Sequence, residues 1–284
     1  MSAEEQLNQG GKTTPAWQLV SYVVVFIFLL WVLIPIVTVA LNSFKPATAI
    51  FTRTPNLGFE PTLSHYQDVL TKGAFPKQIA NSTIVAIGAT ILSLLLGTPA
   101  AYALSRIRFR GSYWWLRAFL FARMVPAVAL VVPMFVILQT TGLKNTHLGL
   151  MLAHTSFALP LVVWMMHSFF AELPAELEEA AIVDGATRFM AFRVVALPLV
   201  LPGLAVTAVL TVFFSWNEFL FALVLTGPAT QTVPIGVSAF VGTVSVDWGG
   251  SSAAAVIAMI PMFIIGLGIQ RFLVRGLAIG AVKG

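Results

Sequence analysis

The sequence predicts an all-α protein that crosses a lipid membrane several times. Of its 284 residues, 58% are hydrophobic and only 10% are charged, with a mean hydropathy of +0.91. A soluble domain carries about 25% charged residues, so much of this surface must face lipid. In addition, apolar runs long enough to cross a bilayer recur along the chain. The absence of cysteine excludes a disulfide scaffold and thiolate metal sites.

Six stretches have the length of about 20 mostly apolar residues that a membrane-spanning helix needs. They cover residues 19–41, 82–104, 115–139, 147–170, 201–226 and 253–275. The first run is longer than a signal-peptide core and no small-x-small cleavage site follows it, so we expect it to be retained. Prolines within several runs are tolerated where neighbouring helices satisfy the freed backbone groups.

Basic residues predict the orientation of these spans. If the N-terminus is cytoplasmic, ten Lys and Arg residues fall on the cytoplasmic side and five in the outer loops. Cytoplasmic loops are enriched in Lys and Arg, so both termini are expected to be cytoplasmic. The predicted organisation is a cytoplasmic tail over residues 1–18, a six-helix membrane domain over 19–275 and a second cytoplasmic tail over 276–284.

Two predicted outer segments are longer than tight turns. Residues 42–81 contain a short helical pattern with Leu63, Tyr66 and Leu70 on one face, and residues 227–252 contain several Gly and Pro residues. Two interpretations stay open for them. They are either linkers that rest on the bilayer surface or a docking face for an external partner.

The cytoplasmic stretch 171–199 holds five of the eleven acidic residues of the chain. It predicts two short helices joined by a turn at Asp184–Gly185, with Pro174 at the first helical position and the second helix starting near Ala186. A helix that lies on the inner leaflet favours a basic face, because that leaflet is anionic. An acidic helix with small residues fits a groove in a protein better, although a surface helix without a partner is the alternative.

The residues of this loop resemble the EAA signature of ABC import permeases. The run Glu179-Ala180-Ala181-x-x-Asp184-Gly185-Ala186 continues to Val195-x-Leu197-Pro198-Leu199, with Val195 where Ile is usual. The resemblance implies a type I ABC importer permease fold, in which this loop is the coupling helix held in a cleft of a cytoplasmic ATPase subunit. The candidate ATPase-coupling residues are Glu178, Glu179, Ala180, Ala181, Asp184, Gly185 and Ala186.

Further pieces, in order along the chain, resemble the carbohydrate-uptake branch, specifically the maltose/trehalose-type second permease. They are Asn81-Ser82, Arg123-Met124-Val125-Pro126, Trp216-Asn217-Glu218-Phe219 and the ending 276–284. The resemblance implies a non-enzymatic subunit of the cell (inner) membrane that imports a sugar, a di- or oligosaccharide, by alternating access. The implied partners are a second permease subunit in a heterodimer, two cytoplasmic ATPase subunits that bind ATP and Mg, and an extracytoplasmic solute-binding protein.

Charged residues within a membrane normally face a protein interior or a water-filled cavity. Arg123 and Glu218 lie in the third and fifth predicted spans at depths that differ by roughly 13 Å, so we do not expect a direct pair. Trp216, Asn217 and Glu218 are candidates for the substrate pathway, although Glu218 bonding a neighbouring helix is an equal alternative. Arg123 is a candidate gating or structural residue. His154 and His167 lack metal-site spacing, so we expect packed or interfacial side chains.

Other classes of function have weaker support. Gly11-Lys12-Thr13 is similar to the end of a phosphate-binding loop, but Gln6 stands where that loop requires glycine. No cofactor is therefore expected on this chain, and no basic polar domain points to nucleic acid. The chief alternative is a secondary transporter driven by an ion gradient, which often shows internal repeats. An intramembrane enzyme is a third class, but no H-E-x-x-H or G-x-S-x-G motif occurs.

Overall fold

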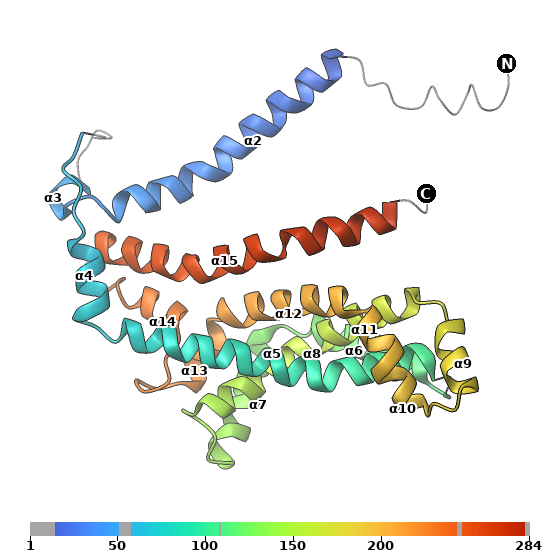
Figure 1. The fold of residues 1–284 in the computed structure, drawn as a ribbon. Coiled ribbons are helices and arrows are strands. Elements are labelled where there is room, and N and C mark those ends of the chain that lie inside the picture. The colour runs from blue at the N-terminus through green and yellow to red at the C-terminus, as the bar shows by residue number, and fades with distance from the viewer. Residues whose placement is uncertain (1–14, 51–57, 108, 243–245, 282–284) are drawn as a thin grey trace.

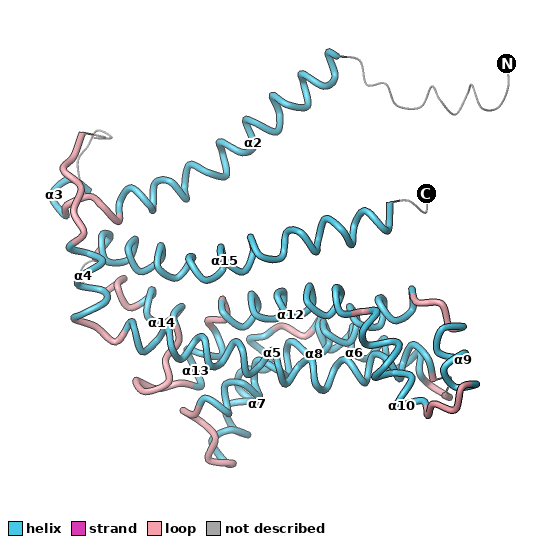
Figure 2. The backbone as a smooth tube through the Cα atoms, in the orientation of Figure 1, coloured by secondary structure: helices cyan, strands magenta, loops and turns pink. Residues whose placement is uncertain are grey.

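The computed structural model describes residues 15–50, 58–107, 109–242 and 246–281 of the chain. These residues are helices and connecting loops, apart from one isolated β-bridge between Val241 and Val246 (Figure 2). The predicted all-α class is confirmed. The segment Gly11-Lys12-Thr13 and most of the predicted N-terminal tail lie outside the described residues.

The helices fall into long elements and short connecting ones. The longer helices are α2 (Pro15–Asn42), α5 (Phe75–Arg106), α6 (Ser112–Met124), α7 (Ala127–Thr140), α8 (His147–Glu172), α12 (Leu201–Trp216) and α15 (Trp248–Ala281). The shorter elements are α3 (Ala47–Ile50), α4 (Ser64–Thr71), α9 (Glu176–Val183), α10 (Arg188–Ala191), the π-helix η1 (Phe192–Ala196), α11 (Leu197–Leu199), α13 (Leu220–Leu225) and α14 (Val233–Ser238).

Four described helices are long and apolar enough to cross a membrane, and two sharply bent helix pairs bring the total to six if each pair is one span. The continuous helices that the sequence predicts over 19–41, 82–104, 147–170 and 253–275 are confirmed as α2, α5, α8 and α15. Helix α15 continues past the predicted end at residue 275 to Ala281. The short helix expected around residues 63–70 is present as α4, but it buries Val69 and leaves Leu70 and its N-terminal cap Leu63 exposed.

The prediction of one helix over 115–139 is wrong. Helices α6 and α7 meet at an angle of 96°, at a break that contains Val125 and Pro126. Proline has no N–H to donate and disfavours the helical conformation of the residue before it. Val125 accordingly has extended backbone angles of φ −69° and ψ 124°.

The prediction of one helix over 201–226 is also wrong. Helix α12 ends at Trp216 and α13 begins at Leu220. The carboxylate of Glu218 accepts hydrogen bonds from the backbone N–H groups of Phe221 (3.0 Å) and Ala222 (3.2 Å). These groups belong to the first turn of α13, where N–H groups have no partner within the helix. Glu218 therefore starts a new helix inside an apolar stretch.

The centre of the bundle is the contact between α5 and α8, against which α12 also packs (Figure 1). Small residues bring α5 and α8 together. A Cβ atom on Gly97 of α5 would lie 2.6 Å from Cγ1 of Val162 on α8. Small residues commonly allow such close approach between membrane helices.

Replacing Gly97 with alanine is expected to lower the free energy of unfolding by about 1–3 kcal/mol, the usual cost of overpacking. The added methyl group would also lie 3.3 Å from Leu159, so the side chains of Val162 and Leu159, or α8 with them, must shift. Thermal unfolding of the purified protein in detergent measures the change. Gly268→Ala is the matched control, because a Cβ there meets nothing within 4 Å. Equal melting temperatures for the two variants would contradict the tight α5–α8 contact.

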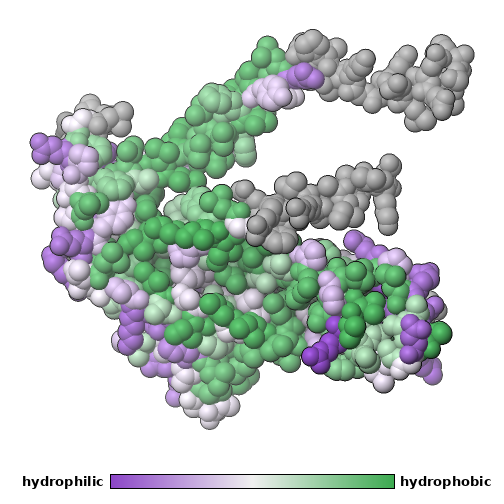
Figure 3. Space-filling model, in the orientation of Figure 1, coloured by the Kyte–Doolittle hydropathy of each residue, from purple (hydrophilic) through white to green (hydrophobic). Residues whose placement is uncertain are grey.

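Helices α2, α5, α8 and α15 run between two ends of the molecule, whereas α7 points away from the bundle (Figure 1). The start of α2, the end of α15, and α9 and α10 lie at one end, here called the α9 end, whereas α3, α4 and α14 lie at the other, the α4 end. Hydrophilic residues gather at both ends, and hydrophobic side chains cover most of α2 and the bundle between them (Figure 3). This distribution is typical of a protein that spans a bilayer.

Candidate functional site

The α9 end carries the acidic loop that the sequence singles out. Helix α9 has three glutamates in its first turn, and Gly185 follows it with φ +94°. The two-helix prediction holds with corrections. Pro174 precedes the N-terminal cap Ala175 and is not the first helical residue, and the second helix begins at Arg188 as α10 and continues into the π-helix η1.

The side of the loop that faces away from the bundle combines acidic, small and apolar residues. Glu179, Ala180, Asp184 and Gly185 are exposed, and Ala181 and Ala186 are partly buried. Large apolar side chains accompany them, with Val183 at 87% and Phe189 at 71% exposure. Exposed apolar groups rimmed by polar ones mark surfaces for protein interaction. The exposed residues just named are called the outward face below: Glu179, Ala180, Val183, Asp184, Gly185 and Phe189.

Glu178 does not belong to the outward face. Its side chain is buried against α5, and the whole residue is only 6% exposed. The hydroxyl of Tyr102 donates to Oε2 of Glu178 at 2.5 Å, and Nε of Arg106 donates to Oε1 at 2.8 Å. Arg106 also donates from Nη2 to the backbone oxygen of Leu173 at 2.7 Å. Sequence spacing groups Glu178 with Glu179, but the structure places the two carboxylates in different environments.

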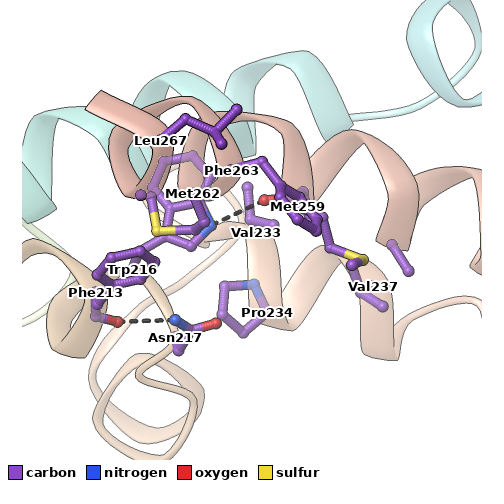
Figure 4. Close-up of a pocket in the computed structure, with 13 residues that line it drawn as sticks. Phe213, Trp216, Asn217, Val233, Pro234, Val237, Met259, Met262, Phe263 and Leu267 are labelled. Atoms are coloured by element: carbon purple, nitrogen blue, oxygen red, sulfur yellow. Dashed lines mark hydrogen bonds between the residues drawn. The ribbon is translucent and has the colours of Figure 1, made fainter. Parts of the chain in front are cut away.

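Trp216 and Asn217 line a cavity of about 780 Å³ between α12, α14 and α15 (Figure 4). Its walls are mostly apolar and include Phe213, Met262 and Phe263. Trp216 is buried and donates from Nε1 to the backbone oxygen of Ala258 at 3.2 Å. The side chain of Asn217 is exposed and donates to the backbone oxygen of Phe213 at 2.8 Å. Cavities of this size with a few polar groups commonly bind small molecules.

Glu218 lies apart from this cavity. It is not among the cavity-lining residues, and its carboxylate holds the start of α13. Oε2 of Glu218 also lies 3.4 Å from Nε2 of His154, whose Nδ1 is 2.7 Å from Oγ of Ser215. These contacts join α8, α12 and α13 and favour the helix-bonding alternative for Glu218. The expected packed state of His154 is confirmed, since this residue is 4% exposed.

Arg123 lies in the last turn of α6, next to the α6–α7 break. Its guanidinium group lies 4.7 Å from the ring centroid of Phe214 and 5.8 Å from that of Phe157. These rings stabilise a cation by cation–π interaction. Within the described residues Arg123 forms no ion pair with Glu218, as the difference in depth predicts. Its Nη1 is buried without a hydrogen-bond partner among them.

A polar network at the α4 end was not predicted. Nδ2 of Asn81 on α5 donates to the backbone oxygen of Gln231 at 2.8 Å, and Oδ1 of Asn81 is 2.8 Å from Nε2 of His147. Oγ of Ser82 accepts from the N–H of Val233 at 2.8 Å. Buried amide and hydroxyl groups normally have such partners. The only sequence signal was the resemblance at Asn81-Ser82, which names no partner.

Comparisons with known proteins agree with this architecture. The family model described as binding-protein-dependent transport system inner membrane component matches residues 93–279. The trehalose transport system permease protein SugB of Mycobacterium tuberculosis is 36% identical over 257 residues, which are 89% of this chain and 93% of that protein. The trehalose/maltose transport system permease protein MalG of Thermococcus litoralis is 37% identical over 238 residues, 82% of this chain and 86% of that protein.

A solved structure confirms the type I ABC importer permease fold. One chain of a bacterial ABC transporter involved in the import of the acidic polysaccharide alginate matches with a TM-score of 0.79. The alignment covers 92% of this chain and 99% of that chain at 23% sequence identity. This likeness in fold agrees with the family match over most of the sequence. The chain belongs to the binding-protein-dependent transport system inner membrane components, the permeases of ABC transporters.

Proposed function

We propose that this chain is one of two permease subunits of an ATP-driven sugar importer and that its outward face binds the cytoplasmic ATPase subunits. The observation that carries the proposal is the exposed acidic and apolar surface of α9 and α10, arranged around the Gly185 turn. It lies at the same end as the start of α2 and the end of α15 (Figure 1). In this proposal the α9 end is cytoplasmic, the chain crosses the inner membrane six times, and each bent helix pair counts as one span.

The chain offers no metal-binding cluster of His, Cys, Asp or Glu in its described part, and the proposal places ATP and Mg on the ATPase subunits. Helix α2 offers an apolar surface on which a second permease could pack. Its described side chains from Trp17 to Thr38 are all exposed and mostly apolar. A surface of this kind must be covered by lipid or by another membrane subunit. The second permease would complete the pore, and an external solute-binding protein would deliver the substrate at the α4 end.

A di- or oligosaccharide is the proposed substrate. The named relatives transport trehalose or maltose according to their descriptions, and the solved relative is involved in the import of alginate. In the cavity, the indole of Trp216 and the amide of Asn217 offer an aromatic surface and hydrogen-bonding groups, which suit a sugar ring and its hydroxyls. We assign Trp216 and Asn217 to the pathway, Glu218 to the bundle, and Arg123 to the support of the α6–α7 break.

Reversing the charge of Glu179 is expected to lower ATPase recovery about fivefold, because an exposed ion pair contributes up to about 1 kcal/mol. A tagged chain would be purified in mild detergent from membranes that contain its natural partners, and co-purified ATPase would be quantified. Glu176→Lys is the matched control, since Glu176 lies exposed in the same helical turn but outside the Glu179-Ala180-Ala181 run.

The unchanged chain provides the decisive test of the proposed function. It is expected to recover an ATPase and a second permease, and sugar uptake into proteoliposomes of the complex should require ATP. Recovery of the chain without an ATPase would contradict the proposal. Uptake that follows an imposed ion gradient without ATP would instead support a secondary transporter.

A further inference from the structure

We propose that Tyr102 and Arg106 are positioning residues that fasten the coupling loop, residues 171–199, to α5, so that the loop and α5 move as one body. The proposal rests on the proposed function of the loop, and it concerns how motion leaves the loop. Both residues lie in the last turns of α5, whereas their partner Glu178 lies in the first turn of α9. In this role neither side chain needs to contact substrate or nucleotide.

The fastening is polar at its centre. Glu178 accepts one hydrogen bond on each carboxylate oxygen, from Tyr102 at 2.5 Å and from Arg106 at 2.8 Å. The side chains of Arg106 and Glu178 are only 15% and 8% exposed, so water screens this ion pair poorly. Arg106 adds a second attachment at the backbone oxygen of Leu173, which lies between α8 and α9. The guanidinium group therefore holds both the entry to the loop and its first helix.

Aromatic packing surrounds this polar centre. The ring of Tyr102 lies 5.4 Å from the ring of Phe170 on α8 and 4.7 Å from the ring of Phe192 on η1. Both phenylalanines are buried. The single residue Tyr102 thus contacts α8 before the loop and both α9 and η1 within it. Such contacts restrict both rotation of the loop and its separation from α5.

Helix α5 provides a path from the loop to the cavity. It contains 32 residues, which span about 48 Å at 1.5 Å per residue. Its other end holds the segment before α14, because Asn81 donates to the backbone of Gln231 and Ser82 accepts from the N–H of Val233. Val233 lines the cavity beside Trp216. A displacement of the coupling loop would therefore reach the cavity wall through one continuous helix.

The test uses the assembled complex in proteoliposomes and compares ATP hydrolysis with sugar uptake. Tyr102→Phe removes the donated hydrogen bond and keeps the ring packing. Arg106→Gln removes the charge and Arg106→Lys retains it. We expect uptake per ATP to fall about tenfold in Tyr102→Phe and Arg106→Gln, the size of effect that one hydrogen bond to a charged group has on an equilibrium. Arg106→Lys should recover part of the loss.

Controls separate this role from a loss of folding. Tyr113→Phe and Arg110→Gln make the same changes at exposed positions near this end of the molecule and should keep the natural ratio of uptake to hydrolysis. All variants should co-purify with the ATPase as the unchanged chain does. If the unchanged chain recovers no ATPase, the proposed function fails. If ATPase binds and Tyr102→Phe keeps the natural uptake per ATP, the fastening alone is overturned.

A distance measurement tests the rigid-body statement directly. The chain has no cysteine, so spin labels can be attached to cysteines introduced at Leu95 on α5 and Val194 on η1, which are 66% and 60% exposed. In the unchanged complex the label distance should stay the same before and after ATP trapping. In Tyr102→Phe and Arg106→Gln it should broaden or shift on trapping. A shift of equal size in the unchanged complex would overturn the proposal.

Discussion

Replacing Gly185 with valine is expected to abolish most ATPase binding while leaving the membrane helices folded. Gly185 has φ +94°, a left-handed conformation between α9 and α10. An L-residue pays about 1–2 kcal/mol for this conformation, and a β-branched residue such as valine pays more. A valine would therefore change the backbone angles of the turn and rotate α10 away from α9. We expect at least about a tenfold loss of co-purified ATPase, which corresponds to this range of energy.

The predicted loss has a specific control. A Cβ atom on Gly185 meets nothing within 4 Å, so the effect comes from the backbone angle and not from a clash. Gly111, between α5 and α6, has φ +96° and equally open surroundings. Gly111→Val introduces the same backbone strain outside the coupling loop and should leave ATPase recovery unchanged. Equal recovery with Gly185→Val and Gly111→Val would contradict a role for the turn in ATPase binding.

The helical class and four of the long helices were predictable because the length of each apolar run is visible in the sequence. It missed the two breaks because both fall within apolar runs. Pro126 was visible, but membrane helices often contain proline, so the sequence did not distinguish a kink from a 96° bend. At Glu218 the new helix depends on two backbone N–H groups, those of Phe221 and Ala222, which donate to the Glu218 carboxylate. Hydropathy does not report such local capping.

The candidate site was also predictable only in part. The Asp184–Gly185 turn was predictable because Asp-Gly is a turn signal and glycine readily adopts the positive φ angle found after a helix. The different roles of Glu178 and Glu179 were not, since the motif gives only their spacing. Successive residues on a helix point about 100° apart, so neighbours in a motif face different surroundings. The partners of Glu178 lie 76 and 72 residues away in the chain, a separation that no local pattern relates to the loop.

Removing the carboxylate of Glu218 is expected to lower the free energy of unfolding by about 2–4 kcal/mol. Each hydrogen bond to a charged group contributes about 1.5–3 kcal/mol, and water that enters the site would recover part of the loss. Glu218→Ala leaves the N–H groups of Phe221 and Ala222 without their acceptor and leaves His154 beside an empty space. Thermal unfolding in detergent measures the loss, and Glu60→Ala, at an exposed acid, should leave the melting temperature unchanged.

Glu218→Gln separates a role in the bundle from a role in the pathway. Glutamine keeps an oxygen that can accept from one N–H group of α13, so this variant should be more stable than Glu218→Ala. If Glu218 only holds α13 and His154 in place, the complex that does assemble should import sugar with an unchanged KM. A raised KM at an unchanged melting temperature would instead place the carboxylate in contact with the substrate. That result would contradict the position of Glu218 outside the cavity that Trp216 and Asn217 line.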